Sequence, residues 1–309
     1  MALHESPPFR HLIDLESKAL VRSLAFSPSG QLLAVGKEDR TIVLYRLSDW
    51  EIIQKIKTEK VIDTLRWNSE GTLLAVGGFA SETIIFNTAN WSRFRTFPAL
   101  LGARSLSWHP SQPYLALSHF PLYDKSVAII ATTTWNIQTL SLSYLATELS
   151  FAPSHRLLAV GKACEGIDIL TINDYKRFVF LDFSDCLSDE PAEITSPSWS
   201  HDGRFLAASS SDGRVRVWST NDWSISTTLQ LFESWDEAVY SCQFSPDNKY
   251  LLCGGFGVPK IIAVKNWLVL QSLGATPSED SLSLAWHPSS SFFALSGRAS
   301  KVIEIWRKR

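Results

Sequence analysis

Seven copies of one sequence pattern run along this chain, and each copy is centred on an aromatic residue that serves as its anchor. A turn and an apolar run such as Leu-Leu-Ala-Val-Gly follow the anchor. The anchors are Phe26, Trp67, Trp108, Phe151, Trp199, Phe244 and Trp286. Subtracting neighbouring numbers gives spacings of 41, 41, 43, 48, 45 and 42 residues. A unit of this length is one supersecondary element that buries its faces against its neighbours.

The second copy shows four strand-like runs. Apolar and polar residues alternate over 61–67, as in a strand that lies between two different faces. A small polar turn leads to a continuous apolar run at 72–77, and a third run covers 83–86. A fourth run opens at Trp91 and ends near Phe97. Four strands in a period of roughly 40–45 residues are typical of one propeller blade. The sequence therefore predicts an all-β, seven-bladed β-propeller of four-stranded antiparallel blades.

A second ladder of aromatic residues recurs with the same period. Its members are Trp50, Trp91, Trp135, Tyr175, Trp223 and Trp267. Aromatic residues at one structural phase of a repeat are usually core, so we expect them to open the outer strands and pack against the neighbouring blade.

The two ends of the chain predict how the ring closes. Residues 9–15 match the fourth-strand pattern, and Phe9 precedes Phe26 by 17 residues, the same step as from Trp50 to Trp67. The chain stops just after a third strand at 301–306. We expect the N-terminal strand to complete the last blade, which hides sheet edges that an open ring would expose. The prediction is a single domain over residues 1–309.

Several segments resemble the repeats of the WD-repeat β-propeller family. The strongest is Ser-Asp-Gly-Arg-Val-Arg-Val-Trp at 211–218, and Phe-Ser-Pro-Ser-Gly at 26–30 resembles the family's turn. The family's Trp-Asp dipeptide is absent from the corresponding repeat positions and its Gly-His dipeptide is missing, so most blades lack its buried His–Asp–Ser/Thr–Trp network. The resemblance implies a non-enzymatic scaffold for protein–protein contacts.

Composition narrows the class of partner and the compartment. Hydrophobic residues make up 45% and charged residues 19%, as in a globular chain, and the net charge is −2. A general nucleic-acid binder needs a strong basic excess, so direct nucleic-acid binding is not expected. No apolar run reaches the roughly 18 residues of a membrane span, and no signal peptide is visible. We expect a cytoplasmic or nuclear protein, and a monomeric propeller within a hetero-complex.

The connections predicted to share the top face of the propeller carry acidic residues. The longest insertion, 182–193, ends at Glu193, and a second acidic segment contains Trp235, Asp236 and Glu237. Asp280 lies in a third. Such a sector attracts a basic peptide or partner surface, and a large aromatic among loop charges is typical of interface anchors. The alternative is a solvated loop whose charges keep the protein soluble.

We call the set of residues at one position of the seven repeats a column. Phenylalanine recurs in the column twelve residues after the anchors. Phe79, Phe120 and Phe256 occupy it in three copies, and Tyr123 follows Phe120 closely. An exposed apolar patch there would mark an interaction site. The alternative is that these rings tuck between blades.

The mouth of the central channel is predicted to carry Arg22, Asp63, Arg104 and Tyr240, four residues before their anchors. This mixed ring could grip a short peptide, or it could consist of ordinary surface ion pairs that each contribute little. At the next repeat position, three residues before each anchor, almost every residue is small, as crowded inner strands require. Glu148 breaks that column, and we expect it to face water or to pair with Arg104.

No pattern for catalysis or metal binding is visible. The chain lacks H-E-x-x-H, zinc-ligand spacings, G-x-S-x-G and phosphate-cradling glycine loops. His109 and His287 precede prolines in turn positions, where we expect them to cap or pack. The sequence predicts no catalytic residues, no metal and no cofactor. A propeller enzyme or small-molecule binder at the channel mouth, and a reader of basic, histone-like peptides, are the alternatives. Residues that break their own repeat column are the functional candidates.

Overall fold

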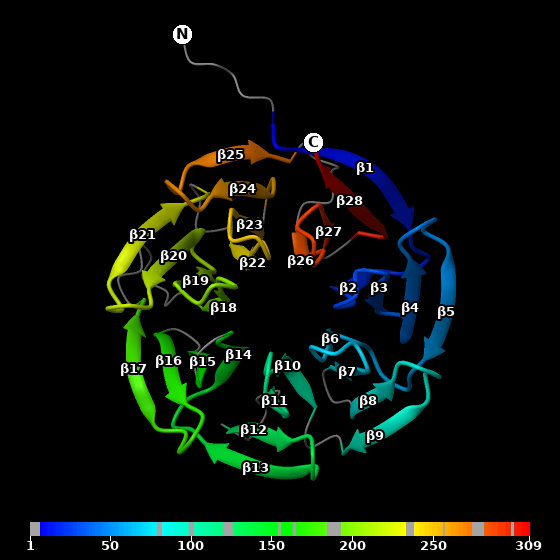
Figure 1. Ribbon diagram of the computed structural model, residues 1–309, viewed down its shortest axis with the longest axis horizontal. Coiled ribbons are helices and arrows are strands. Elements are labelled where there is room, and N and C mark those ends of the chain that lie inside the picture. The colour runs from blue at the N-terminus through cyan, green and yellow to red at the C-terminus, as the bar shows by residue number, and fades with distance from the viewer. Residues whose placement is uncertain are drawn as a thin grey trace.

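Seven four-stranded antiparallel sheets form a closed ring around a central axis in the computed structural model (Figure 1). The structure describes residues 7–78, 82–98, 102–119, 126–153, 156–162, 165–183, 193–232, 238–255, 257–273, 281–297 and 300–309. Within these ranges there is no helix, and hence none long and apolar enough to cross a membrane. The predicted all-β, seven-bladed propeller is confirmed.

Each blade runs outward from a strand beside the axis to a strand on the rim. The innermost strands are β2 (Val21–Phe26), β6 (Thr64–Trp67), β10 (Ala103–Trp108), β14 (Ala146–Phe151), β18 (Ile194–Trp199), β22 (Val239–Phe244) and β26 (Ser281–Trp286). The second strands are β3 (Leu32–Lys37), β7 (Leu73–Gly77), β11 (Tyr114–His119), β15 (Leu157–Lys162), β19 (Phe205–Ser210), β23 (Tyr250–Gly255) and β27 (Phe292–Gly297).

The outer half of each blade follows the same order. The third strands are β4 (Thr41–Arg46), β8 (Thr83–Asn87), β12 (Ser126–Ala131), β16 (Gly166–Thr171), β20 (Arg214–Ser219), β24 (Lys260–Ala263) and β28 (Val302–Lys308). The rim strands are β5 (Ile52–Lys57), β9 (Arg93–Phe97), β13 (Asn136–Ser141), β17 (Arg177–Asp182), β21 (Ile225–Gln230), β25 (Val269–Ser272) and β1 (Phe9–Glu16). The second and third strands are buried on both faces, which explains their continuous apolar sequences.

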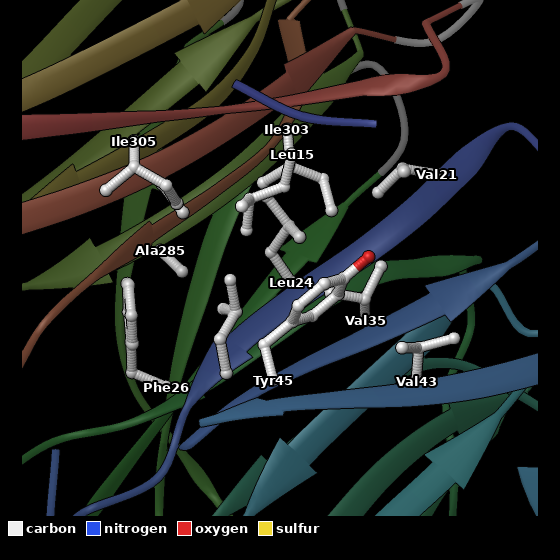
Figure 2. Close-up of a cluster of buried hydrophobic side chains, with 12 residues drawn as sticks. Leu15, Val21, Leu24, Phe26, Val35, Val43, Tyr45, Ala285, Ile303 and Ile305 are labelled. Carbon is white, nitrogen blue, oxygen red and sulfur yellow. The ribbon is translucent and has the colours of Figure 1, made fainter. Parts of the chain in front are cut away.

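The ring closes through β1, as the sequence predicted. β1 pairs antiparallel with β28, from Phe9 opposite Lys308 to Glu16 opposite Val302. Figure 2 shows the resulting interface between the last and first blades, where Leu15 packs with Ile303 and with residues of β2 and β3. The N-terminal strand thus supplies both backbone pairing and apolar contact to the last blade.

In the four blades whose anchor is a tryptophan, the anchor connects the blade to the one before it. The indole Nε1 of every tryptophan anchor donates a hydrogen bond to the backbone oxygen just before the preceding anchor. The pairs are Trp67 to Ala25 (3.1 Å), Trp108 to Arg66 (2.9 Å), Trp199 to Ser150 (3.0 Å) and Trp286 to Gln243 (3.0 Å). These bonds satisfy the indole N–H in a buried position and hold neighbouring inner strands in register.

Serine hydroxyls of the inner strands make a second set of links between blades. Ser23 accepts from the Leu65 N–H (3.1 Å) and Ser105 from the Leu149 N–H (3.1 Å). Ser283 accepts from the Leu24 N–H (2.9 Å), which continues the set across the closure. Small size is therefore only part of the reason for this serine column, because its hydroxyls also replace missing strand partners.

The second aromatic ladder lies in turns rather than in strands. All six residues adopt the left-handed conformation, with φ between 52° and 63°. The side chain just before each ladder residue accepts the N–H of the residue just after it. These acceptors are Asp49, Asn90, Thr134, Asp174, Asp222 and Asn266. The rim strand starts one or two residues later, so the expectation that the ladder opens the strand was wrong by that margin.

The expected packing of the ladder against a neighbouring blade is confirmed, and the neighbour is the preceding blade. The Trp135 ring lies 5.5 Å from Phe94, and the Trp223 ring lies 6.0 Å from Phe178, both centroid to centroid. Trp267 meets Phe205 of the preceding blade edge to face at 5.2 Å. Left-handed backbone is costly for a bulky residue, and this packing holds it in place.

Candidate functional site

The strand order assigns every connection to one of two faces. The turns between first and second strands and between third and fourth strands lie on one face, which we call the bottom face. The connections between second and third strands and between blades lie on the opposite, top face. The described residues among those predicted to bind partners lie at the top ends of inner strands or directly before them.

Eight of the predicted partner-binding residues lie outside the described residues. They are Phe79, Phe120, Tyr123, Trp235, Asp236, Glu237, Phe256 and Asp280. Their role in partner binding remains a prediction. Arg22, Asp63, Arg104, Glu193 and Tyr240 are described, and all five are half-buried at the top end of the channel.

Both arginines at the channel mouth bind carboxylates. Arg22 Nη2 lies 2.7 Å from Glu38 Oε1 within the first blade. Arg104, in the third blade, forms an ion pair with Glu193, which precedes the first strand of the fifth blade. This second pair crosses over the fourth blade. The sequence suggested Glu148 as the partner of Arg104, but Glu193 holds that place.

An open cavity of about 610 Å³ lies along the axis, and it is lined by inner-strand residues and by bottom-turn residues such as Pro110 and Pro246. Arg66, Glu148 and Gln243 line it. Burial raises the pKa of the Glu148 carboxyl, and a hydrogen bond from Ser105 and the charges of Arg66 and Arg104 offset part of the rise. Burial also lowers the pKa of the Arg66 guanidinium, with Glu148 opposing. The cavity thus holds one cationic and one anionic group on different blades.

Sequence reasoning singled out Glu148 but missed Arg66 and Gln243. Both occupy the position just before an anchor, where the other blades have Ala25, Ser107, Ser150, Ser198 and Ala285. A long polar side chain in a column of small residues was the available signal.

The two histidines in turn positions both cap and pack, as expected. His109 Nδ1 accepts the N–H groups of Ser111 (3.2 Å) and Gln112 (2.9 Å), and its ring lies 5.1 Å from that of Phe151. His287 Nε2 lies 3.0 Å from the Gly30 oxygen, across the closure. In the described part of the chain, no three His, Cys, Asp or Glu side chains gather as metal ligands would.

Two family models match parts of the chain. The one described as the anaphase-promoting complex subunit 4 WD40 domain matches residues 12–70 and 24–109. The one described as the WD domain, G-beta repeat matches residues 185–219 and 226–257. The second match covers the segment at 211–218 that most resembles the family motif in sequence.

Curated relatives share modest identity with the chain. Protein hir1 of Emericella nidulans is 28% identical over 155 residues, 41% of this chain and 15% of that protein. Guanine nucleotide-binding protein subunit beta-1 of Drosophila melanogaster is 33% identical over 64 residues, 21% of this chain and 18% of that protein. Protein HIR1 of Gibberella zeae is 28% identical over 149 residues, which are 40% of this chain and 14% of that protein. The matches thus span less than a fifth of each relative's length. Together with the seven four-stranded blades, the family matches show that the chain belongs to the WD-repeat β-propeller family.

Proposed function

We propose that this propeller is a non-enzymatic scaffold that binds partner proteins or peptides on its top face, as a subunit of a larger complex. The observation that carries the proposal is the pair of arginine–carboxylate contacts at the channel mouth. In the first pair the side chain of Arg22 is 24% exposed and that of Glu38 40% exposed. In the second pair Arg104 is 30% exposed and Glu193 39% exposed. The two pairs present partly exposed charges of both signs, and charges of this kind favour specificity over bulk affinity when a partner complements them.

The partner class that this surface favours is a basic peptide with an apolar anchor. Glu193, Asp236 and Asp280 supply acidic groups, and Trp235, Phe79, Phe120, Tyr123 and Phe256 supply apolar ones. Since Glu193 is already paired with Arg104, a basic partner residue must compete for it or bind the other carboxylates. A histone-like tail is one peptide of this chemistry, and binding to it falls with salt.

Affinity purification with identification of co-purifying proteins tests the scaffold. The purification is repeated with a variant carrying Trp235→Ala and Phe79→Ala, and with the rim variant Ile137→Ser as matched control, since Ile137 is 42% exposed on β13. We expect the double variant to lose partners that the control retains. If the double variant keeps every partner, the top-face site is wrong.

The axial cavity favours a second candidate, a channel that binds a small polar molecule. Arg66 and Glu148 offer opposite charges to one ligand within about 610 Å³. Thermal-shift screening against metabolites and peptides separates the two functions. If a metabolite stabilises the wild-type protein and Glu148→Gln abolishes that stabilisation, the channel site is supported. If only peptides stabilise the protein, the scaffold is supported.

A further inference from the structure

A groove of about 520 Å³ opens on the bottom face between the fifth and sixth blades. Phe205, at the start of β19, and Tyr250, at the start of β23, contribute aromatic rings to it, and Leu270 of β25 contributes an aliphatic side chain. Arg204 and Lys249, in the bottom turns, and Lys265, in the turn before Trp267, add positive charge. The groove therefore combines an apolar lining with cations, on the face opposite the predicted partner site.

Two residues beside this groove break their repeat columns. Leu268 directly follows a ladder aromatic, where the other blades have Glu51, Ser92, Asn136, Lys176 and Ser224. Lys265 lies two residues before the same aromatic, where the others have Ser48, Ala89, Thr133, Asn173 and Asn221. Fold geometry alone does not explain either residue, because the same turn forms in the other blades with uncharged or polar residues.

The apolar residues next to the groove are exposed. Leu268 is 60% exposed, Val269 47% and Leu270 39%, and Leu268 is the most exposed large hydrophobic residue of the described chain. Leu268 directly precedes the four-residue rim strand of the sixth blade, and Val269 and Leu270 are the first two residues of that strand. A contiguous exposed apolar run beside a groove marks an interaction surface.

The cations around the groove outnumber the carboxylates that they contact. Arg204 pairs with Asp202 at 2.7 Å, and Lys308, whose Nζ lies 5.0 Å from the Tyr250 ring, pairs with Asp247 at 3.4 Å. Lys249 and Lys265 are exposed, and neither forms an ion pair with a carboxylate in the described part of the chain. The whole chain has a net charge of −2, so this local positive excess is not a general property of its surface.

We propose that the groove between the fifth and sixth blades docks an acidic, leucine-containing segment of a partner protein. A leucine of that segment would pack between Phe205, Tyr250 and Leu270. Its acidic neighbours would pair with Lys249 and Lys265, the cations without a carboxylate partner. An apolar centre with a charged rim is the usual anatomy of a protein interface, and the charge complementarity selects an acidic occupant. This bottom surface is distinct from the top-face site and does not depend on it.

The test is a fluorescence anisotropy titration with a fluorescein-labelled peptide in which leucines are separated by pairs of Glu and Asp residues. Wild-type protein should bind it, with affinity falling as salt screens the charges. Leu268→Ser and Lys265→Glu should each weaken binding at least about fivefold. The matched rim variants Ile53→Ser and Lys55→Glu, on β5, should bind like wild type.

Control peptides separate the two components of the site. Replacing the leucines by serine or the acidic residues by glutamine should each weaken binding. Equal binding by Leu268→Ser, Lys265→Glu and wild-type protein would overturn the proposal. So would preference for phosphatidylserine vesicles over the peptide, or a Leu268-dependent dimer in sedimentation, since either assigns the groove to another occupant. The Trp235→Ala, Phe79→Ala variant should bind the peptide normally, so failure of the top-face site leaves this test interpretable.

Discussion

The side-chain amide of Gln271 binds both backbone polar groups of Phe9. Gln271 Oε1 accepts the Phe9 N–H at 3.1 Å, and Gln271 Nε2 donates to the Phe9 oxygen at 3.0 Å. Gln271 belongs to the rim strand of the sixth blade and Phe9 to β1, which completes the seventh. The glutamine therefore acts as an extra strand partner where the N-terminal strand begins.

Gln271→Ala should weaken the closure of the ring. Two hydrogen bonds to the backbone are lost, and the expected cost in the free energy of unfolding is about 1–2 kcal/mol. Denaturant unfolding measures this cost, with Gln138→Ala on the exposed rim of the third blade as the control. Equal stability of the two variants would show that the Gln271 bonds contribute nothing beyond those of a surface glutamine.

Trp199→Phe should destabilise the fold more than Trp223→Phe does in the same blade. The first change removes the indole bond to the Ser150 oxygen, whereas no indole bond of Trp223 is found in the described chain. Phenylalanine already serves as the anchor in three blades, so the site tolerates its shape. We expect an excess cost of about 1 kcal/mol in chemical denaturation. A larger cost for Trp223→Phe would remove the indole bond as an explanation.

At Trp91, glycine should be a better replacement than alanine. Its φ is 58°, a conformation that glycine adopts freely and alanine does not. Both variants lose the ring's packing, but Trp91→Gly should unfold with a free energy about 1 kcal/mol higher than Trp91→Ala. At Thr96, in the strand β9, the order should reverse, because glycine weakens a strand. A higher free energy of unfolding for the alanine variant at both positions would contradict the role assigned to the left-handed turn.

The repeat predicted the fold because every blade buries the same faces in the same order. Period and alternation revealed the blades, and the step from Phe9 to Phe26 revealed which strand closes the ring. Left-handed turns at Trp50 and its equivalents were not predicted, since aromatic residues seldom adopt that conformation. The repeat pattern carries no sign of backbone handedness at an aromatic position, so local propensity pointed to a strand.

Pairing across the channel was harder to foresee than the strands. The Arg104–Glu193 contact joins side chains separated by 89 residues and skips a blade, so column position alone did not reveal it. The groove beside Lys265 and Leu268 was visible in principle, because both residues break their columns. It was not predicted, because a single substitution in a regular turn leaves the repeat period unchanged, whereas the long top-face connections alter it.

Stability should fall on acidification because of His109. Burial, and then the positive charge of Arg156, hold the pKa of His109 below its usual value. The unfolded chain therefore takes up a proton first, and the stabilisation present above about pH 6.5 is lost as the pH falls towards the folded pKa. His109→Asn keeps an acceptor for the turn, as Asn68 does in the second blade. Unfolding free energies at about pH 7.5 and about pH 5 should show a smaller pH dependence for the variant, the difference bounded by about 1.4 kcal/mol per pH unit. An unchanged slope would exclude His109 as the source.

Glu148→Gln should stabilise the protein at neutral pH. The folded pKa of Glu148 is raised by burial, despite the Ser105 hydrogen bond and the charges of Arg66 and Arg104, so folding favours the protonated carboxyl. The contribution of Glu148 to the free energy of unfolding is most favourable below the pKa that this carboxyl has in the unfolded chain. It is lost as the pH rises through the pKa of the folded state. Glutamine stays neutral throughout, so the variant should exceed wild type in unfolding free energy at neutral pH and match it in acid. Glu70→Gln, on the exposed turn before β7, is the control and should leave stability unchanged at both pH values. Destabilisation by Glu148→Gln at neutral pH would mean that attraction to Arg66 outweighs the burial of the carboxylate.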